Sequence, residues 1–337
     1  MKDLRDYSLK GHNTFGLEAR CSRFMEYGNV EEACAIASVV RSSDVPYFII
    51  GGGSNLLLTR DFAGIVIHSA MSGMELLCDT RLRCGSGVVW DDMVAWTVNH
   101  GLVGAENLSL IPGDVGASAV QNIGAYGVEV KDLIAEVEAV EIATGKILTF
   151  NNNDCQYGYR DSRFKREWKN KYLITHVTYQ LMPLAQHPSF HLDYGNIRAE
   201  LEKRGIAIPT PQQLRQVIID IRQAKLPDPK VMGNAGSFFV NPVVSRDQYE
   251  RLAAQYPDMP HYHVDDCHEK IPAGWMIEQC GWKGRSLGRA GVHDKQALVL
   301  VNRGGATGAE IVALCRAIQQ DVKAKFGIEI HPEVNMI

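Results

Sequence analysis

The sequence lacks the features that mark membrane, secreted and disulfide-stabilised proteins. No apolar run is long enough to span a bilayer, and the first residues, MKDLRDYSLKGHNTFG, contain no apolar core of a signal peptide. The eight cysteines include no CxxC pair and none of the dense spacing of a disulfide scaffold. We therefore expect reduced thiols, no membrane partner and a cytoplasmic protein.

The chain also lacks an excess of positive charge. Its formal net charge is -4 and its sequence pI is about 6.3. Without a basic field we expect no nucleic-acid partner, and an anionic ligand would have to be held by a local site. The 337 residues, 45% of them apolar, are enough for roughly two domains with large cores. No internal repeat and no low-complexity tract is present.

What the sequence does contain is a mixture of helical and strand patterns. Apolar spacing and capping signals predict helices over 30–42, 91–100 and 211–225, one starting after Ser245, and one from Thr307 to Gly327. Strands are predicted at 47–50 and 65–68, in a hairpin around 144–145, at 172–181 and at 328–337. This pattern is typical of the α+β class.

The stretch IIGGGSNLLL places three glycines, Gly51, Gly52 and Gly53, directly after a strand. Consecutive amides without side chains can face an anion, and Ser54 and Asn55 add further donors, as a pyrophosphate requires. The third glycine of a GxGxxG fingerprint is missing, and a strand is expected to follow instead of a helix. A simple tight turn is the alternative.

A second glycine-rich stretch, IPGDVGASAVQNIGAYG, covers residues 111–127. Its few charges and repeated glycines are hard to explain by packing alone. The stretch suits a flat, polar, partly aromatic ligand lying along the backbone. Two such stretches in one half of the chain favour a dinucleotide.

Two charged stretches are further candidates. GYRDSRFK supplies Tyr159 and Arg160, and a planar guanidinium there could match a carboxylate, although charged loop residues usually form a solvated surface. QAKLPDPK supplies Lys225 and Lys230 around a rigid Pro-Asp-Pro. Lysines near a helix end normally complement the helix dipole. Their closeness in sequence to the next motif strengthens a functional interpretation.

The stretch GNAGSFFVNP places one hydroxyl, Ser237, between a glycine and two phenylalanines. It predicts a tight turn that leads into a short buried aromatic strand. Ser237 is therefore either a turn residue bonding its own backbone or a positioned proton carrier. The later stretch HYHVDDCHEK is rich in metal-ligating residue types, but its spacing matches no ligand motif, so we expect no bound metal.

Taken in order, these motifs resemble one family. NTFG, GGGSN, IPG.VGAS..QNIGAYG, YRDS.FK, KLPDPK, GNAGSFF.NP, AGW.I and PEV are similar to the UDP-N-acetylenolpyruvoylglucosamine reductases, flavoenzymes of bacterial peptidoglycan synthesis. The resemblance extends over nearly the whole chain, from Asn13 to Val334. It is closest to the subclass in which a tyrosine on a mobile loop covers the substrate.

The resemblance implies an FAD-binding domain of the vanillyl-alcohol-oxidase type, made of two α+β subdomains, and a carboxy-terminal α+β substrate-binding domain. The expected boundaries are 1–67 with about 320–337 for subdomain 1, 68–210 for subdomain 2 and 211–319 for the substrate domain. The final strand is expected to return to subdomain 1.

The resemblance also implies that both glycine-rich stretches hold FAD. Neither stretch contains a histidine or cysteine, so noncovalent flavin is expected. The expected cofactor-binding residues are Gly51, Gly52, Gly53, Ser54, Asn55, Pro112, Gly113, Gly116, Ser118, Gln121, Asn122, Gly124, Ala125 and Tyr126.

In this family NADPH reduces FAD and leaves, and the enolpyruvyl ether of UDP-N-acetylglucosamine takes its place to accept a hydride and a proton. Hydride addition creates a carbanion or enolate beside a carboxylate, so cations and an acid are needed there. By match, Ser237 is the proton donor, and Arg160 with Glu333 polarises the carboxylate. Such an acid contributes about 10² to 10⁴ in rate.

The remaining substrate contacts are also implied by match. Tyr194, in LDYGNI, corresponds to the tyrosine of the covering loop. The expected substrate-binding residues are Tyr159, Tyr194, Lys225, Asn241, Tyr262, Lys270 and Gln296. Partners other than NADPH and this nucleotide sugar are not expected, and the protein is expected to be a monomer.

The match leaves departures and two alternatives. Ala119, Val240 and Asn335 stand where relatives often carry proline, lysine and arginine, and Glu329 shares the predicted strand parity of Glu333. One alternative is a flavin-dependent oxidase of similar fold, which would use oxygen. The other is a nucleotide-binding module without redox chemistry, which would be colourless.

Overall fold

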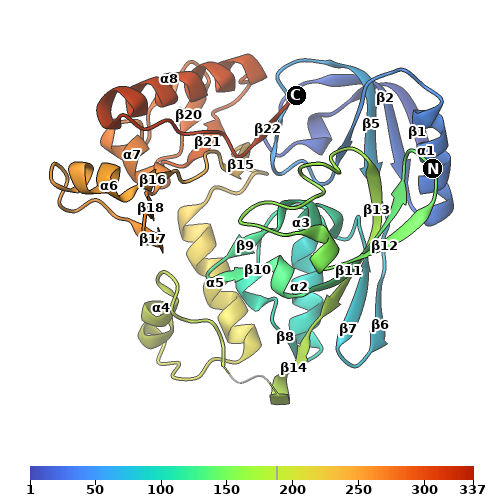
Figure 1. Cartoon of the computed structure of the whole chain (residues 1–337), viewed down its shortest axis with the longest axis horizontal. Coiled ribbons are helices and arrows are strands. Elements are labelled where there is room, and N and C mark those ends of the chain that lie inside the picture. Colours follow the sequence, from blue (N-terminus) through green and yellow to red (C-terminus); the bar gives the residue numbers. More distant parts are fainter. Residues whose placement is uncertain (187–188) are drawn as a thin grey trace. The chain divides into compact units, whose positions relative to one another are not determined.

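The computed structural model describes residues 1–186 and 189–337 (Figure 1). Its contacts divide the chain into two compact units, each built from separate segments. Unit 1 comprises Met1–Tyr7, Cys21–Gly52 and Ala63–Ala224, and unit 2 comprises Ser8–Arg20, Gly53–Phe62 and Lys225–Ile337. The three-part division expected from the resemblance is finer than this one and stays a prediction.

The first sheet has the strand order β1-β2-β5-β3. Its strands are β1 (Lys2–Ser8), β2 (Arg20–Tyr27), β5 (Phe62–Ser69) and β3 (Tyr47–Ile50), and β3 runs parallel to β5. Helix α1 (Val30–Arg41) begins where the Asn29 side chain accepts from the Glu32 amide. Its residues Ala33, Ile36, Ala37 and Val40 recur at helical spacing and are buried in a core shared with β2 and β5. This helix and the strand at 47–50 confirm the prediction.

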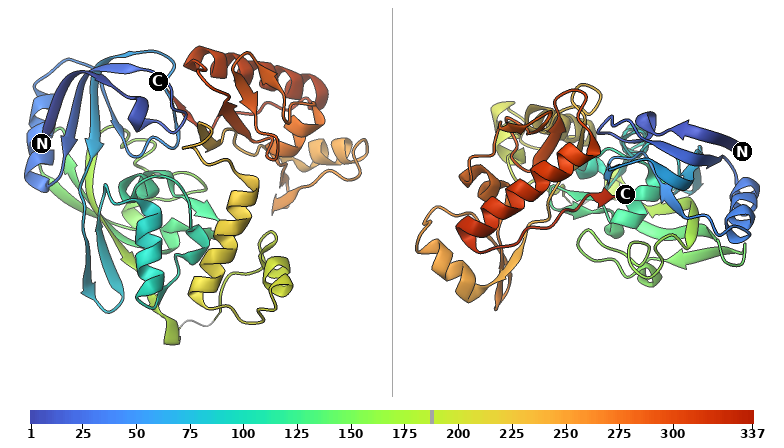
Figure 2. Two further views of the ribbon diagram at one scale, coloured as in Figure 1. Left: turned by 180° about the vertical axis from the view of Figure 1, so that it is seen from behind. Right: turned by 90° about the horizontal axis from the view of Figure 1, so that it is seen from above.

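The second sheet of unit 1 is antiparallel, in the order β12-β11-β13-β7-β6. Its strands are β12 (Ile147–Asn151), β11 (Ile134–Glu141), β13 (Tyr172–Gln180), β7 (Arg81–Gly85) and β6 (Met74–Cys78). Helices α2 (Trp90–Asn99) and α3 (Val115–Gln121) contact each other, and α3 packs on β13 and β7 (Figure 2). The buried Trp90 ring meets Tyr179 edge to face at 5.8 Å. A wide apolar core therefore lies under the second glycine-rich stretch.

The remaining elements of unit 1 are short, apart from one long helix. Helix α4 (Ile197–Lys203) and helix α5 (Pro211–Lys225) share an apolar cluster against which Tyr126 packs. Two-stranded pairs join β9 (Gly124–Ala125) to β10 (Val128–Glu129) and β8 (Leu102–Val103) to β14 (Met182–Pro183). Single 3-10 turns in the chain cover Lys10–His12, Glu106–Leu108, Val130–Asp132, Asn153–Cys155 and Leu184–Gln186.

Unit 2 contains a four-stranded and a three-stranded sheet. The first has the order β15 (Asn234–Ser237), β21 (Val299–Asn302), β20 (Ala290–Val292) and β19 (Ser286–Leu287), and the second β16 (Val243–Ser245), β18 (His268–Lys270) and β17 (Tyr262–Asp265). Helix α8 (Gly308–Phe326) packs on β19 to β21 and on α7 (Ala273–Gln279), while α6 (Arg246–Ala253) contacts β16 (Figure 1). As predicted, Thr307 and Glu310 form a capping box and Gly327 ends α8.

Two local predictions are wrong. The last residues form only the short strand β22 (Asn335–Met336), which pairs in parallel with β4 (Leu56–Leu57), instead of a strand over 328–337. In GNAGSFF the strand is Asn234–Ser237, while Phe238 and Phe239 lie outside it as core residues. In both cases burial of apolar side chains overrides the local pattern. The stretch 111–127 contains helix α3, for which no secondary structure was predicted from the sequence.

Candidate functional site

The predicted site residues divide between the two units. Unit 2 holds Gly53, Ser54, Asn55, Lys225, Ser237, Asn241, Tyr262, Lys270, Gln296 and Glu333, and unit 1 holds the others.

In unit 1 the first glycine turn packs directly against the second glycine-rich stretch. The Gly52 amide donates a hydrogen bond to the Asp114 carboxylate. A Cβ on Gly51 would lie 2.9 Å from the Cβ of Ala117, and one on Gly52 would lie 3.3 Å from the Cα of Gly113. A Cβ at Gly51 would require Ala117 to shift and one at Gly52 would be tightly placed, so the two glycine-rich stretches are in direct contact.

The second stretch carries backbone strain at several points. Among the described residues seven non-glycine residues have positive φ. Two of them, Asn122 and Tyr126, lie in this stretch, Leu110 directly precedes it, and Arg160 donates a hydrogen bond to its Gly124. Strained conformations of this kind persist where surrounding structure fixes them, and they cluster at ligand sites. This clustering is independent support for a binding site at residues 111–126.

The side chains of Ser118 and Asn122 have partners inside the protein. The buried Ser118 hydroxyl donates to the Val115 carbonyl at 2.7 Å and contacts the Tyr179 hydroxyl at 3.0 Å. The buried Asn122 amide donates to the Gly158 carbonyl at 2.7 Å. A bound cofactor would therefore meet the backbone of these two residues, while their side chains hold the segment in shape.

Arg160 lies in a loop, and its side chain contacts β9. Its Nη2 donates to the Gly124 carbonyl at 2.6 Å, and its guanidinium lies 5.7 Å from the centre of the Tyr159 ring. The Lys165 ammonium donates to the Arg160 carbonyl at 2.9 Å, which helps to hold the residue at a φ of 55°. Arg160 and Tyr159 are thus brought next to the second glycine-rich stretch.

Sequence reasoning missed a second cation here, Arg222 on α5. Burial lowers the pKa of its guanidinium, as does the positive charge of Arg160, while Tyr126 and Asp91 act in the opposite direction. Its buried Nε has no hydrogen-bond partner among the described residues. The only signal was an arginine three residues before Lys225 on a predicted helix. Two guanidiniums therefore lie near Tyr126, whose pKa is raised by burial.

Tyr194 lies beside the same tyrosine. Its ring meets Tyr126 edge to face at 6.3 Å, and its Cβ would be 3.7 Å from a Cβ on Gly127. The side chain is about half exposed. The predicted catalytic residue Arg160 and the predicted substrate-binding residue Tyr194 therefore both border residues 124–127, and Tyr159 lies beside Arg160.

In unit 2 the structure brings Ser237, Glu333 and Asn55 to one place. The Glu333 amide donates to the Phe238 carbonyl at 2.8 Å, and Phe239 pairs with Pro332. The Asn55 side chain donates to the Glu333 carbonyl at 3.4 Å. Ser237 itself is exposed, at the end of β15. By contrast, Glu329 is exposed and pairs with Lys323 at 2.5 Å, so the two glutamates differ in surroundings.

The other predicted residues of unit 2 surround the three-stranded sheet and the start of α7. The Asn241 side chain accepts from the Ala273 amide at 2.9 Å and the Lys270 ammonium lies 5.6 Å from the centre of the Tyr262 ring. The Gln296 Oε1 accepts from the Leu298 amide at 3.3 Å. Lys225, at the end of α5, is exposed.

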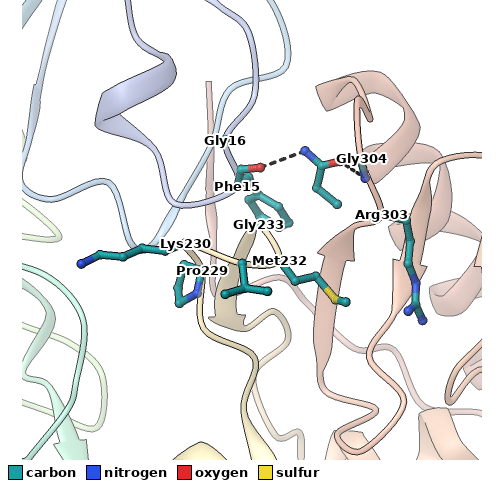
Figure 3. A pocket seen from close by; sticks show the side chains of 10 residues that line it. Phe15, Gly16, Pro229, Lys230, Met232, Gly233, Arg303 and Gly304 are labelled. Carbon is teal, nitrogen blue, oxygen red and sulfur yellow. Dashed lines mark hydrogen bonds between the residues drawn. The ribbon is translucent and has the colours of Figure 1, made fainter.

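A pocket of about 330 Å³ in unit 2 is separate from these residues (Figure 3). Phe15, Lys230, Met232 and Arg303 are among its lining residues, and Asn302 donates to the Phe15 carbonyl at 3.0 Å. None of the predicted catalytic or substrate-binding residues lines it. No helix of the described residues is long and apolar enough to cross a membrane.

Comparison with known proteins identifies first the class and then the family. Residues 22–151 match the model of an FAD-binding domain, and residues 228–337 match the carboxy-terminal domain of UDP-N-acetylenolpyruvoylglucosamine reductase. With the glycine-lined segments of unit 1, this combination defines an FAD-dependent oxidoreductase.

Full-length relatives carry the name that the carboxy-terminal match gives. The chain is 54% identical over 336 residues to UDP-N-acetylenolpyruvoylglucosamine reductase of Bacteroides fragilis (98% of this chain and 99% of the relative) and 46% identical over 336 residues to that of Burkholderia multivorans (98% and 95%). The chain belongs to the UDP-N-acetylenolpyruvoylglucosamine reductases. The crystal structure of the Thermus caldophilus enzyme has the same fold, with a TM-score of 0.68, 21% identity and coverage of 99% and 98%.

The predicted class, fold, cofactor and activity are thereby confirmed. The enzyme is an FAD-binding UDP-N-acetylmuramate dehydrogenase that uses NADPH in peptidoglycan precursor synthesis. The residues of unit 1 fit FAD, because Gln121 and Tyr126 are neutral hydrogen-bonding side chains suited to a flavin, and Leu110, Asn122 and Tyr126 are held at positive φ, as residues at ligand sites often are.

Proposed function

We propose that Ser237 is the acid that protonates the α-carbon of the enolpyruvyl group and that Arg160 and Glu333 stabilise the enolate that forms beside its carboxylate. When bound, FAD supplies hydride transfer: it accepts a hydride from NADPH and passes it to the β-carbon of the substrate. Addition of hydride at the β-carbon leaves an electron pair on the α-carbon, conjugated with the carboxylate. A cation near that carboxylate and an acid near the α-carbon then complete the lactyl ether.

The observation that carries this proposal is the pairing of the Ser237 and Glu333 segments. The bond from the Glu333 amide to the Phe238 carbonyl fixes the two residues on adjacent backbone within unit 2. Because Phe238 and Phe239 are buried, Ser237 is attached to a rigid support while its own side chain is exposed to a substrate. A weak acid needs such positioning, since its proton transfer competes with that of water.

The proposed role of Arg160 is supported by its fixed backbone and by the second guanidinium nearby. A planar guanidinium binds a carboxylate by two parallel hydrogen bonds. Arg222 adds positive potential at the same part of unit 1, and its charge is only partly balanced by Asp91, which already forms a two-bond pair with Arg215. We assign Arg222 an electrostatic role in holding the anionic substrate.

We further propose that FAD is held by the two glycine-rich stretches and that the substrate is held by the residues transferred from the family. Those are Gly51, Gly52, Gly53, Ser54, Asn55, Pro112, Gly113, Gly116, Ser118, Gln121, Asn122, Gly124, Ala125 and Tyr126 for FAD, and Tyr159, Tyr194, Lys225, Asn241, Tyr262, Lys270 and Gln296 for substrate. For Ser118 and Asn122 the proposal is limited to the backbone.

The subclass, the compartment and the assembly are also proposals. The contact of the Tyr194 ring with Tyr126 supports the subclass in which this tyrosine covers the substrate. All eight cysteines are free thiols, which supports a reducing compartment, and we infer a cytoplasmic enzyme. We expect a monomer, since both sets of site residues come from one chain.

An anaerobic half-reaction tests the proposed activity. The purified protein is bleached with NADPH, excess nucleotide is removed, and UDP-N-acetylglucosamine enolpyruvate is added. Rapid recovery of the oxidised flavin spectrum, with formation of UDP-N-acetylmuramate, is expected. Recovery with oxygen but not with the enolpyruvyl substrate would indicate an oxidase and contradict the proposal.

A further inference from the structure

Asp114 occupies a central position in unit 1 that the activity does not explain. It is the residue directly before α3, where an aspartate normally accepts from the first amides of its own helix. Here the side chain makes no such capping bond. Its carboxylate turns instead toward the other glycine-rich stretch, where it accepts from the Gly52 amide.

The fit between this carboxylate and the glycine turn is close. A Cβ on Gly51 would lie 3.3 Å from Asp114 Oδ2, and a Cβ on Gly52 would lie 3.2 Å from Asp114 Oδ1. The backbone of Asp114 is fixed as well, because it pairs with Val89 and the neighbouring Val115 amide donates to the Val88 carbonyl at 2.9 Å. One side chain thus joins a rigid segment to a turn that has no side chains of its own.

The side of Asp114 away from the turn faces a chain of charged groups. The His68 Nε2 lies 3.9 Å from Asp114 Oδ2, and its Nδ1 lies 3.0 Å from Glu26, which pairs with Lys2 at 2.5 Å. His68 is also opposite Ile50 in the pairing of β5 with β3, immediately before the glycine turn. The Asp114 side chain is 12% exposed. Burial raises its pKa and the Gly52 hydrogen bond opposes this effect, so that the pKa is raised to about 7.

We propose that Asp114 is a positioning residue for FAD, whose side-chain oxygen fixes the Gly51–Gly52 turn against the start of α3 so that two glycine-rich stretches form one preformed surface for the nucleotide. This inference rests on the assignment of both stretches to FAD. A turn of consecutive glycines loses much conformational freedom when it is ordered. A hydrogen bond that orders it in advance removes that loss from the binding step, which strengthens binding without a direct contact.

The test compares two uncharged variants that differ in whether the side chain at position 114 has an oxygen to accept a hydrogen bond. Asp114→Asn keeps an oxygen that can accept from the Gly52 amide, whereas Asp114→Ala removes it. Flavin is removed from each protein, circular dichroism at 10 °C confirms that the flavin-free chain is folded, and FAD affinity is measured at 10 °C by quenching of flavin fluorescence. We expect Asp114→Ala to bind FAD about tenfold more weakly, the effect of one hydrogen bond, and Asp114→Asn to stay within about threefold of the unsubstituted protein.

The inference fails if Asp114→Ala binds FAD as tightly as the unsubstituted protein, or if Asp114→Asn loses as much affinity as Asp114→Ala. If Asp114→Ala does not fold, Asp114→Leu fills a similar volume without an acceptor and takes its place in the comparison. If the unsubstituted protein itself does not take up FAD, the assignment of the glycine-rich stretches fails instead. The two failures are therefore distinguishable.

Discussion

At the scale of single residues, the role proposed for Ser237 depends on the backbone that supports it. Its position follows from the buried phenylalanines that come after it and from the pairing of Phe238 with Glu333. Sequence analysis could single out the hydroxyl because nothing around it required a serine. It could not show which backbone lies beside it, because that neighbour is separated by almost one hundred residues.

We predict that Ser237→Ala slows the oxidation of reduced flavin by the enolpyruvyl substrate by about 10² to 10⁴, which corresponds to roughly 3 to 5 kcal/mol of transition-state stabilisation. Reduction of flavin by NADPH should be unchanged, because that step needs no acid at the α-carbon. Stopped-flow absorbance measures both steps separately. Ser286→Ala, at an exposed strand position of the same unit, is the control and should change neither step. An equal loss of the NADPH step would show that Ser237 is not the proton donor.

The titration of Asp114 gives a second prediction at this scale. Its pKa is raised from 3.8 to about 7 in the folded protein, so the folded state binds more protons than the unfolded state between these values. The contribution of Asp114 to the free energy of unfolding is therefore greatest below about pH 4. It falls as the pH rises through 7, by about 4 kcal/mol in total. Asp114→Asn should remove that pH dependence and stabilise the flavin-free protein at pH 8.

Urea unfolding of the flavin-free protein at pH 5 and pH 8 measures this effect. The difference between the two pH values should be smaller in Asp114→Asn than in the unsubstituted protein. His68→Gln is a useful control, because it removes the imidazole that lies 3.9 Å from Asp114 and leaves the aspartate. If both variants and the unsubstituted protein share the same pH dependence, Asp114 does not titrate in this range.

At the scale of elements, one ion pair joins two helices of unit 1. Asp91, in the first turn of α2, receives two hydrogen bonds from Arg215 on α5, at 2.7 and 2.9 Å. It also accepts from the Leu110 amide at 2.5 Å. Burial opposes ionisation of Asp91, but these partners outweigh burial, so its pKa is lowered. The pair therefore fixes α5, which carries Arg222, beside the second glycine-rich stretch.

We predict that Asp91→Ala destabilises the protein by about 3 kcal/mol, because it leaves the Arg215 guanidinium partly buried without its partner and removes an acceptor from Leu110. Arg215→Ala should cost about 2 to 3 kcal/mol. The double variant should be less destabilised than the sum of the single variants, since the interaction can be lost only once. Urea denaturation curves of the four proteins test this. Simple additivity would show that the two side chains do not interact.

The elements also show what a local pattern can predict. Helices α1, α2, α5 and α8 were predicted within one or two residues, because each has an apolar stripe and clear end signals. Helix α3 was missed because Gly116 and Ser118 weaken the helical pattern, although Asp114 before it was a possible starting signal. The final strand was predicted to be too long. Its apolar residues Ile328 and Ile330 suggested a strand, but they are buried in the core of unit 2 without joining a sheet.

At the scale of the whole molecule, the core of unit 2 depends on residues far away in the sequence. Phe15, Leu17 and Leu57 are buried in the same cluster as Phe238 and Ile311. The Thr14 hydroxyl donates to the Asn234 carbonyl at 2.6 Å, and a Cβ on Gly233 would lie 2.1 Å from the Phe15 carbonyl oxygen. The region that matches the carboxy-terminal domain model is therefore not the complete unit.

We predict that a fragment of residues 225–337 alone is poorly folded, because it exposes the apolar surface that Phe15, Leu17 and Leu57 cover. Linking residues 8–20 and 53–62 to that fragment should restore a cooperative transition. Dispersion of amide proton signals in NMR spectra and thermal melting distinguish the two polypeptides. A cooperative melt of the shorter fragment would contradict the prediction.

The pairing of β22 with β4 has a consequence for how the chain is made. The Asn335 side chain donates to the Asn55 carbonyl across 280 residues of sequence, and the Ile337 amide bonds to Leu57 at 3.0 Å. A growing chain cannot complete this pairing until residues 335–337 have left the ribosome. Contacts of such sequence separation form slowly, since the intervening chain must first be ordered. The contact between Asn55 and Glu333 is thus completed only after residues 335–337 have been synthesised, and we expect this part of unit 2 to form late in folding.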